Sequence, residues 1–286
     1  MNNISKLEKF LNFIKELDGS LKFEIIEIGA HPYSQKEEPF YKILEFFPNS
    51  RINAFDVDKD ECIKLNKISK KGVKFFPYAI GEKREKRKFY ETNHPMCSSL
   101  YEPDNQLLKL YNNFEMAYLK NISEIETISL DYFLEEQKIK TVDFIKIDIQ
   151  GAELDVFRGA KNCLENVLSI VSEVEFVPIY KNQPLFGDIC SFLKDKDIIF
   201  HKFLGLAGRT MVPVIFNNNK NFATQHFWSD AIFTKNVLNF KNFKNPQLLK
   251  MAVFSYLYGS PDLTYYCLSN YDKNNGKSVI ELFKKI

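Results

Sequence analysis

Acidic side chains close three of the apolar segments that are predicted to be buried strands. Glu27 lies near the end of "FEIIEIG", Asp56 follows "RINAF", and Asp148 ends "VDFIKID". In an open parallel sheet, ligands bind in the crevice at the carboxyl ends of the strands, so these positions belong to one candidate site. A carboxylate after the second strand can accept both hydroxyl hydrogens of a ribose. The pattern therefore indicates a nucleoside-binding site with Asp56 as the ribose ligand.

Local structure offers another explanation for each of these residues. Gly29, which would let the backbone approach a ligand, could equally be a flexible strand end. Asp56 and Asp58 could cap the helix that follows them, and Asp148 and Glu153 could do the same for the next helix start. Three acids at successive strand ends favour a shared site over three separate caps.

The elements that would position these acids alternate between strand and helix. Apolar segments at 23–29, 51–58, 73–81, 142–148 and 168–176 are predicted strands, and helices are predicted at 39–48, 59–72, 151–164 and 187–195. Strands too apolar to be exposed on one face require helices on both sides of a mostly parallel sheet. The predicted fold class is therefore α/β.

Three further parts complete the predicted organisation. Residues 89–130 interrupt the alternation as an insertion, with a helix around 107–119 and a strand at 124–130. Late strands are expected at 198–204, 210–216 and 229–235, the last ones antiparallel. The resulting division is an amphipathic helix at 1–20, the α/β domain at 21–236 and a helical extension at 237–286.

The extension is predicted to be a helical hairpin. Gly259 would end its first helix, and Ser260 would cap the second, with Pro261 and Asp262 in the opening turn. The hairpin is expected to pack either on the main domain or on another subunit, which would make the protein a homo-oligomer.

Charge and composition exclude several classes of function. The net charge of +2 and the pI of about 8.1 suggest neither nucleic acid nor an anionic membrane as the main partner. Lys146 inside its strand is expected to extend its ammonium to solvent, and the run "EKREKRK" at 82–88 to form a solvated hairpin tip.

Cysteine usage and hydropathy bear on the compartment. The five cysteines form no C-x-x-C pair, so no zinc site or redox disulfide is expected, and a reduced, cytoplasmic setting follows. Charged residues interrupt the first helix, so it is neither a signal peptide nor a membrane span. Elsewhere no apolar run approaches the ~20 residues that cross a bilayer.

A series of short motifs resembles the FkbM family of S-adenosylmethionine-dependent methyltransferases. The resemblance covers residues 23–236, and the block at 142–160 is its most specific part. In order, the motif residues are Glu27-Ile28-Gly29, Phe55-Asp56, Ala79-Ile80-Gly81, Ser98-Ser99-Leu100, Thr127 to Asp131 and Lys146 to Ala160. After the first strand the chain has "EIGAHPYSQ" in place of D-x-G-A-N-x-G, so the cofactor loop is expected to take another shape.

The resemblance implies a Rossmann-like class I methyltransferase fold, S-adenosylmethionine as the donor, and O-methylation of a hydroxyl on a sugar or glycan precursor, such as a surface polysaccharide or a related metabolite. Asp56 would hold the ribose, and Asp148 would face the methyl-transfer zone. The residues implied to contact the cofactor are Glu27, Gly29, Ala30 and His31 in the first loop, Asp56 and Val57, Tyr78 and Ala79 beside the adenine, and Asp148.

Methyl transfer to a hydroxyl also needs a general base, which commonly contributes about 10² to 10⁴ in rate. Asp148, Glu175 and His226 are the predicted catalytic residues, and Glu173 and His94 are further candidates. Carboxylates scattered over two strands are no liganding motif, so no metal is predicted.

Two other functions share the predicted sheet. A nicotinamide-dependent sugar oxidoreductase would need G-x-G-x-x-G, and "GAHPYS" lacks the later glycines. A non-catalytic protein that keeps the fold without the cofactor would be consistent with the altered loop. Both remain alternatives to the methyltransferase.

Overall fold

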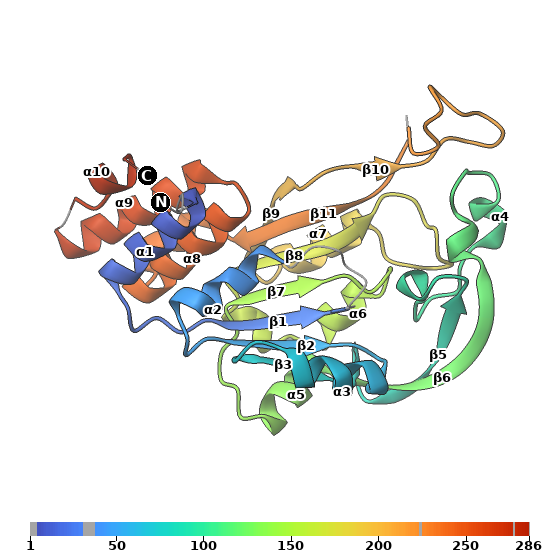
Figure 1. The fold of residues 1–286 in the computed structure, drawn as a ribbon, viewed down its shortest axis with the longest axis horizontal. Coiled ribbons are helices and arrows are strands. Elements are labelled where there is room, and N and C mark those ends of the chain that lie inside the picture. Colours follow the sequence, from blue (N-terminus) through green and yellow to red (C-terminus); the bar gives the residue numbers. More distant parts are fainter. Residues whose placement is uncertain (1–4, 31–37, 223–224, 277, 286) are drawn as a thin grey trace.

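Seven strands form the continuous path of the central sheet, in the order β10-β11-β8-β7-β1-β2-β3, and β9 pairs with β11 as the eighth (Figure 1). The computed structural model describes residues 5–30, 38–222, 225–276 and 278–285. The parallel strands are β1 (Glu24–Ile28), β2 (Arg51–Phe55), β3 (Val73–Phe76), β7 (Phe144–Ile147) and β8 (Ser169–Glu175). The antiparallel strands are β9 (Ile198–Phe203), β10 (Ala207–Gly208) and β11 (His226–Lys235). The predicted α/β class, with a mostly parallel sheet and late antiparallel strands, is confirmed.

Helices cover both faces of this sheet because its strands are apolar on both sides. Ile26, Ile28 and Ile145 face one helical layer, whereas Ile25 and Phe144 face the other. The first layer contains α5 (Leu130–Glu136), α6 (Glu153–Arg158) and α7 (Phe186–Lys194). The second contains α1 (Lys6–Leu17), α2 (Ile43–Phe46), α3 (Lys59–Ile68) and α8 (Asn245–Leu257).

The predicted third strand is wrong, because it is two strands in two sheets. Pro77 has no N–H to donate, and the chain turns there, with Tyr78 N bonded to Phe76 O at 3.0 Å. A second sheet then forms in the order β4-β6-β5, from β4 (Ala79–Gly81), β5 (Glu85–Thr92) and β6 (Leu119–Ser129). In the charged run at 82–88, the first three residues form the turn that leads from β4 to β5, and the rest begin β5. β4 and β5 lie on either side of β6.

The insertion contains less helix than predicted. The expected helix at 107–119 is only α4 (Asn105–Leu108) and a 3₁₀ turn, η3 (Glu115–Ala117), and β6 begins at Leu119. Asn113 has φ +62°, which ends the helical path, and Asn112 N donates to Thr210 O at 2.9 Å instead of to a helical carbonyl. A further 3₁₀ turn is η2 (Pro95–Cys97).

Other predicted elements are shorter than expected, and one is absent. The helix at 39–48 is a 3₁₀ turn, η1 (Pro39–Lys42), followed by α2, and that at 151–164 is α6 followed by η4 (Cys163–Glu165). Residues 210–216 form no strand, because this segment makes only two isolated β-bridges, from Met211 to Tyr111 and from Phe216 to Asn219. Their apolar side chains are exposed rather than buried in the sheet.

The helical hairpin is confirmed as α8 and α9 (Pro261–Asn275), preceded by η5 (Val237–Asn242) and followed by α10 (Ile280–Phe283). Gly259 ends the first helix with φ +66°. Ser260 occupies the N-cap position, but its hydroxyl makes no cap bond and lies 3.0 Å from His201 Nε2. Of the two predicted packing partners, the hairpin contacts the main domain.

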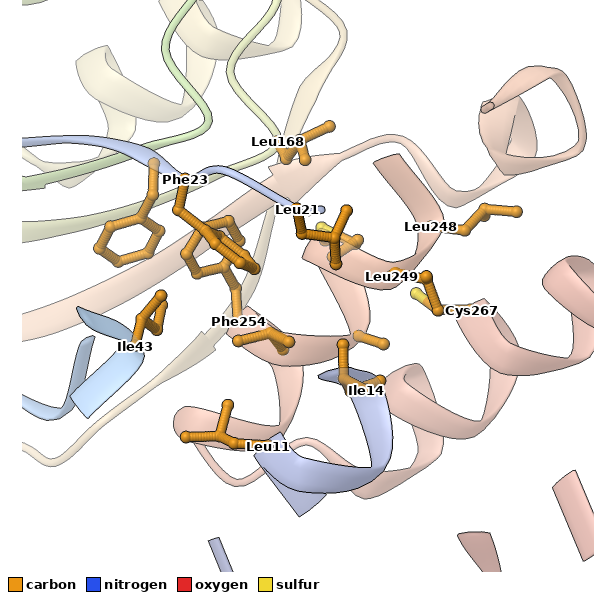
Figure 2. Close-up of a cluster of buried hydrophobic side chains, with 14 of the residues drawn as sticks. Leu11, Ile14, Leu21, Phe23, Ile43, Leu168, Leu248, Leu249, Phe254 and Cys267 are labelled. Atoms are coloured by element: carbon orange, nitrogen blue, oxygen red, sulfur yellow. The ribbon is translucent and has the colours of Figure 1, made fainter. Parts of the chain in front are cut away.

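The first helix and the hairpin form one helical layer, although they come from opposite ends of the chain (Figure 2). Phe10 of α1 stacks on Tyr256 of α8 at 4.0 Å between ring centroids. Phe254 packs edge-on against Phe23 at 5.6 Å and stacks on Phe144 at 4.7 Å. This layer therefore covers the amino ends of β1 and β7. No described helix is both long and apolar enough to span a membrane.

Candidate active site

A pocket opens where β1, β2, β3 and β7 end, and the inserted segment closes its far side. The pocket and its open mouth together enclose about 820 Å³ of empty space. The lining residues are Ile28, Gly29, Phe55, Asp56, Val57, Tyr78, Ala79, Ile80, Phe89, Pro95, Met96, Ser98, Ser99, Leu100, Asp148, Ile149 and Gln150. Six of the predicted site residues therefore meet here: Gly29, Asp56, Val57, Tyr78, Ala79 and Asp148.

Gly29 joins the first strand to the pocket wall in a conformation that requires glycine. Its φ is +81°, and a Cβ at this position would lie 1.9 Å from the carbonyl oxygen of Asp148. The N–H groups of Gly29 and Ala30 both donate to Phe55 O, at 3.1 and 3.0 Å. The backbone is thus drawn close to two neighbouring strand ends, and no side chain stands between it and the pocket.

The two acids after β2 have separate roles. Asp58 is the N-cap of α3, and its Oδ1 accepts from Glu61 N at 3.0 Å. Asp56 is buried and lines the pocket, where its Oδ1 accepts from Asp58 N at 2.7 Å. The cap explanation therefore holds for Asp58, and Asp56 presents a carboxylate to the pocket.

Apolar side chains beside Asp56 form a flat-sided region at the pocket mouth. The side chains of Val57 and Tyr78 are mostly apolar, yet each of these residues is 43% exposed. The ring of Tyr78 is near-parallel to that of Phe76, at 6.4 Å, and Ile80 closes the buried side. A planar ligand could cover these surfaces and remove them from water.

Lys146 is buried rather than extended to solvent, which corrects the prediction for this residue. Its side chain is only 8% exposed, and its Nζ lies 3.0 Å from Asp230 Oδ1 and 3.6 Å from Asp148 Oδ2. Burial works against the charged form, but these carboxylates outweigh it and raise the pKa of Lys146. The ion pairs join Asp148, which lines the pocket after β7, to Asp230 in the middle of β11.

Gln150 connects Asp148 to a second carboxylate and was not identified from the sequence. Its Nε2 donates to Asp148 Oδ1 at 3.0 Å and to Glu173 Oε2 at 2.6 Å. The backbone of Gln150 has φ +61°. Ser99 Oγ donates to the carbonyl oxygen of Gln150 at 2.7 Å, and Tyr180 OH donates to its Oε1 at 3.1 Å. The available signal was the adjacent glycine, since "QG" favours a left-handed turn.

The two carboxylates that Gln150 bridges titrate in opposite directions. Burial opposes ionisation of Asp148, but Lys146 and the hydrogen bonds from its neighbours lower the pKa of Asp148 on balance. Burial, followed by the charges of Asp148 and Glu175, raises the pKa of Glu173 well above its usual range. These shifts favour a proton on Glu173 and a negative charge on Asp148. Such a pair can accept a hydrogen bond from a hydroxyl and take up its proton.

The other predicted site residues that the structure describes, Glu27, Ala30, Glu175 and His226, do not line the pocket. Glu27 points to the opposite face of β1, where Tyr41 OH donates to its Oε2 at 2.5 Å. Glu175 is buried, with Oε2 lacking a hydrogen-bond partner, and burial raises its pKa well above the usual range. His226 is exposed at the start of β11, opposite Gly208. His31 lies outside the described residues.

The further candidates and the helix-start acid also have defined places. His94 is the N-cap of η2, directly before the lining residues Pro95 and Met96. Glu153 is the first residue of α6, which agrees with its interpretation as a helix-start acid. Its Oε1 accepts a hydrogen bond from Ile149 N at 2.8 Å.

Several of the motif residues hold the insertion in place rather than contact the pocket. Asp131 accepts from the backbone N–H groups of Asn162 and Cys163, both at 2.9 Å. At Gly159 a Cβ would lie 2.3 Å from Gly81 O, so glycine is needed for β4 to reach α6. Arg87 of β5 pairs with buried Asp155 of α6 at 3.2 Å. These contacts position the segment that closes the pocket.

Among the described residues, no group of three or more histidine, cysteine, aspartate or glutamate side chains is arranged to hold a metal ion.

Comparison with known proteins gives one family match and several weak relatives. The model of the FkbM methyltransferase domain matches residues 10–200. The 2-O-methyltransferase NoeI of Sinorhizobium fredii (strain NBRC 101917 / NGR234) is 22% identical over 205 residues, which cover 68% of this chain and 79% of that protein.

Two solved structures align at low TM-scores. The 23S rRNA methyltransferase ErmE has a TM-score of 0.33 at 5% identity, over 89% of this chain and 80% of that one. LepI in complex with SAM has a TM-score of 0.32 at 8% identity, over 81% and 47%. At such scores the likeness to these structures carries no weight, whereas the family match covers more than half of the chain.

Proposed function

The chain belongs to the FkbM methyltransferase family, and from this premise we propose that it methylates a hydroxyl oxygen of a sugar or glycan precursor with S-adenosylmethionine as the donor. One observation carries the proposal: Asp56 presents a carboxylate to a pocket built from the carboxyl ends of four strands. That is the position from which an acid binds a ribose in Rossmann-like folds.

The residues of the pocket fit such a cofactor. Asp56 would accept the ribose hydroxyl hydrogens, and the exposed apolar surfaces of Val57 and Tyr78 would cover the adenine, next to Ala79. The backbone at Gly29 would approach the methionine part, because no Cβ intervenes. When bound, the cofactor would supply a methyl carbon activated by a sulfonium.

The acceptor side of the site is proposed to lie at Asp148. Its side chain is 40% exposed, so a hydroxyl from outside can reach it, and Lys146 keeps it ionised. Asp148 would accept the hydrogen bond of the acceptor hydroxyl and orient its oxygen. The hydroxyl proton would then pass to the carboxylate pair formed by Asp148 and Glu173. Because Glu175 and His226 do not line the pocket, its geometry favours Asp148 as the base.

The name of the relative supports oxygen as the accepting atom, since NoeI is a 2-O-methyltransferase. For a sugar, the support is the polar wall of the acceptor side, where Gln150, Ser98 and Asp148 offer both donors and acceptors. We place the reaction in the cytoplasm because all five cysteines are unpaired.

Calorimetric titration with S-adenosylhomocysteine tests the cofactor assignment. The wild-type chain should bind, and Asp56→Ala should lower the affinity by about tenfold or more, as expected for a charge-assisted hydrogen bond. Asp58→Ala is the matched control, because it removes the same carboxylate from a residue that caps α3 instead of lining the pocket. Binding of a nicotinamide dinucleotide in place of S-adenosylhomocysteine would favour the oxidoreductase.

The acceptor is tested separately. Purified enzyme is incubated with isotopically labelled S-adenosylmethionine and a panel of mono- and oligosaccharides, and products are analysed by mass spectrometry. A labelled methyl ether on a sugar hydroxyl supports the proposal. Methylation confined to nitrogen, carbon or non-sugar acceptors contradicts it.

A further inference from the structure

The segment between β10 and β11 exposes large apolar side chains that the proposed methyl transfer does not use. We define the projecting loop as residues 209–222. Met211, Val212, Val214, Ile215, Phe216 and Phe222 in this loop are 44 to 53% exposed. Six such side chains within 14 residues form a continuous apolar region, and exposed regions of this kind mark sites of interaction with a protein or a membrane.

The projecting loop is held in shape by hydrogen bonds on its inner side. Asn112 N donates to Thr210 O at 2.9 Å, and Val212 N donates to Leu110 O at 2.8 Å. Across the loop, Thr210 Oγ1 donates to Lys220 O at 3.1 Å, and Asn219 N closes a turn on Phe216 O at 2.7 Å. Since the backbone bonds to the insertion, the exposure of the apolar side chains is a feature of an ordered loop.

Shape and charge identify the partner. Figure 1 shows the loop projecting beyond the end of the sheet on the side of α4, so it presents a convex tip. Residues 198–229 contain no aspartate or glutamate, whereas the chain average of 37 in 286 would place about four among these 32 residues. Within the projecting loop the charged residues are Arg209 and Lys220. Lys202 lies in β9, where its Nζ donates to Gly259 O at 2.7 Å. A projecting loop with exposed apolar side chains, whose only charged residues are Arg209 and Lys220, suits a surface that combines apolar chains with anionic head groups.

A second copy of this chain suits the tip less well. Away from the candidate active site, one hollow of the described structure is lined by charged residues that include Lys22, Arg51 and Lys250. Another, between β11 and α8, has an empty volume of only about 180 Å³. Neither offers an apolar groove for Ile215 and Phe216.

We propose that the projecting loop inserts its apolar tip into an anionic lipid bilayer, so that the enzyme works at a membrane surface. Binding would be peripheral, through Met211 to Phe216, with Lys220 beside the head groups. The loop is also bonded to the insertion, whose residues close the active-site pocket. The proposal goes beyond the methyl transfer and does not depend on which acceptor is used.

Vesicle flotation with the full chain tests this. Wild-type protein should float with vesicles of phosphatidylcholine and phosphatidylglycerol, and more weakly with phosphatidylcholine alone. The double variant Ile215→Ser with Phe216→Ser should lose at least about tenfold in partition coefficient, because it removes two inserted apolar side chains. Lys220→Ala should lose about fivefold on the anionic vesicles only.

The matched control is Ile68→Ser with Leu238→Ser, which removes two side chains that are 80% and 74% exposed on other elements. It should float like the wild type, and circular dichroism should show that both double variants are folded. The proposal is overturned if wild-type protein stays with none of the vesicles, or if both double variants float equally. It is also overturned if gel filtration shows a dimer that only the loop variant loses.

Discussion

The two ends of the central sheet use their side chains in opposite ways. At the amino ends of β1 and β7, α1, α8 and α9 bury a dense aromatic and aliphatic layer that includes Phe23, Phe144 and Phe254 (Figure 2). At the carboxyl ends, Asp56 and Asp148 face an open pocket, with charged groups held by ion pairs. The first end therefore contributes mainly stability, and the second contributes binding and chemistry. Substitutions at the two ends should separate these properties.

The largest effect is expected at the carboxyl end. Asp148→Asn keeps the shape of the side chain but removes the charge that accepts the acceptor proton, so kcat should fall about 10²- to 10⁴-fold. Affinity for S-adenosylhomocysteine should change little, whereas the melting temperature should fall, because the variant loses the ion pair with buried Lys146. Single-turnover methyl transfer and calorimetry measure the first two quantities. Full activity in this variant would remove Asp148 from the proton path.

At the amino end, Phe254→Ala should have the reverse signature. Phe254 is 1% exposed and contacts the rings of Phe23 and Phe144, so its removal leaves a cavity and should cost about 3 to 5 kcal/mol in the free energy of unfolding. Urea denaturation gives this quantity, and S-adenosylhomocysteine affinity below the transition should stay at the wild-type value. A lost affinity in the folded variant would mean that the two ends are coupled.

Glu27 lies near the carboxyl end of β1 but outside the pocket, and it should make stability depend on pH. Burial raises the pKa of Glu27 to about 7, so the folded state binds a proton more tightly than the unfolded chain, whose value is near 4.5. The resulting stabilisation is present below about pH 4.5 and is lost as the pH rises through about 7. Relative to Glu27→Gln, the wild type should lose up to roughly 3 kcal/mol over this range.

Urea denaturation of both proteins at several pH values measures this difference. A constant difference between wild type and Glu27→Gln from pH 4.5 to 8 would show that Glu27 titrates normally. In Glu27→Gln, Tyr41 OH can still donate a hydrogen bond to the amide oxygen of residue 27. The variant therefore removes the titrating group and keeps the acceptor of this bond.

The smallest effect separates the two neighbouring acids after β2. Asp58→Ala removes the cap of α3 and should cost about 1 kcal/mol of stability without changing cofactor affinity. Thermal unfolding and calorimetry check the two parts. If Asp58→Ala loses as much affinity for S-adenosylhomocysteine as Asp56→Ala, the assignment of Asp58 to capping and Asp56 to ligand binding is wrong.

Buried strands were the part of the fold that the sequence predicted well, because their apolar runs have no other stable environment. The insertion was predicted poorly: the third strand divides at Pro77, and an expected helix ends at Asn113. In that region, pairing with distant segments such as Thr210 outweighs local propensity. The expected strand at 210–216 failed for a related reason, since its apolar residues face outward.

For the candidate site, the sequence identified the residues directly after each strand, since chain order alone places them at one edge of a parallel sheet. It could not assign Glu27 to the far face, because a shift of one residue along a strand reverses the direction of the side chain. The sequence did not reveal the hydrogen bond from Gln150 to Glu173, because this contact joins the turn after β7 to β8.

By itself the sequence determined the α/β class and the strand-end position of Asp56 and Asp148. These follow from hydrophobic periodicity and from backbone geometry, which act over a few residues. Only the tertiary structure decided that Lys146 is buried between two carboxylates, that Gln150 bridges Asp148 and Glu173, and that the projecting loop exposes its apolar tip. Those properties depend on burial and on charges brought together from distant strands, which no local pattern encodes.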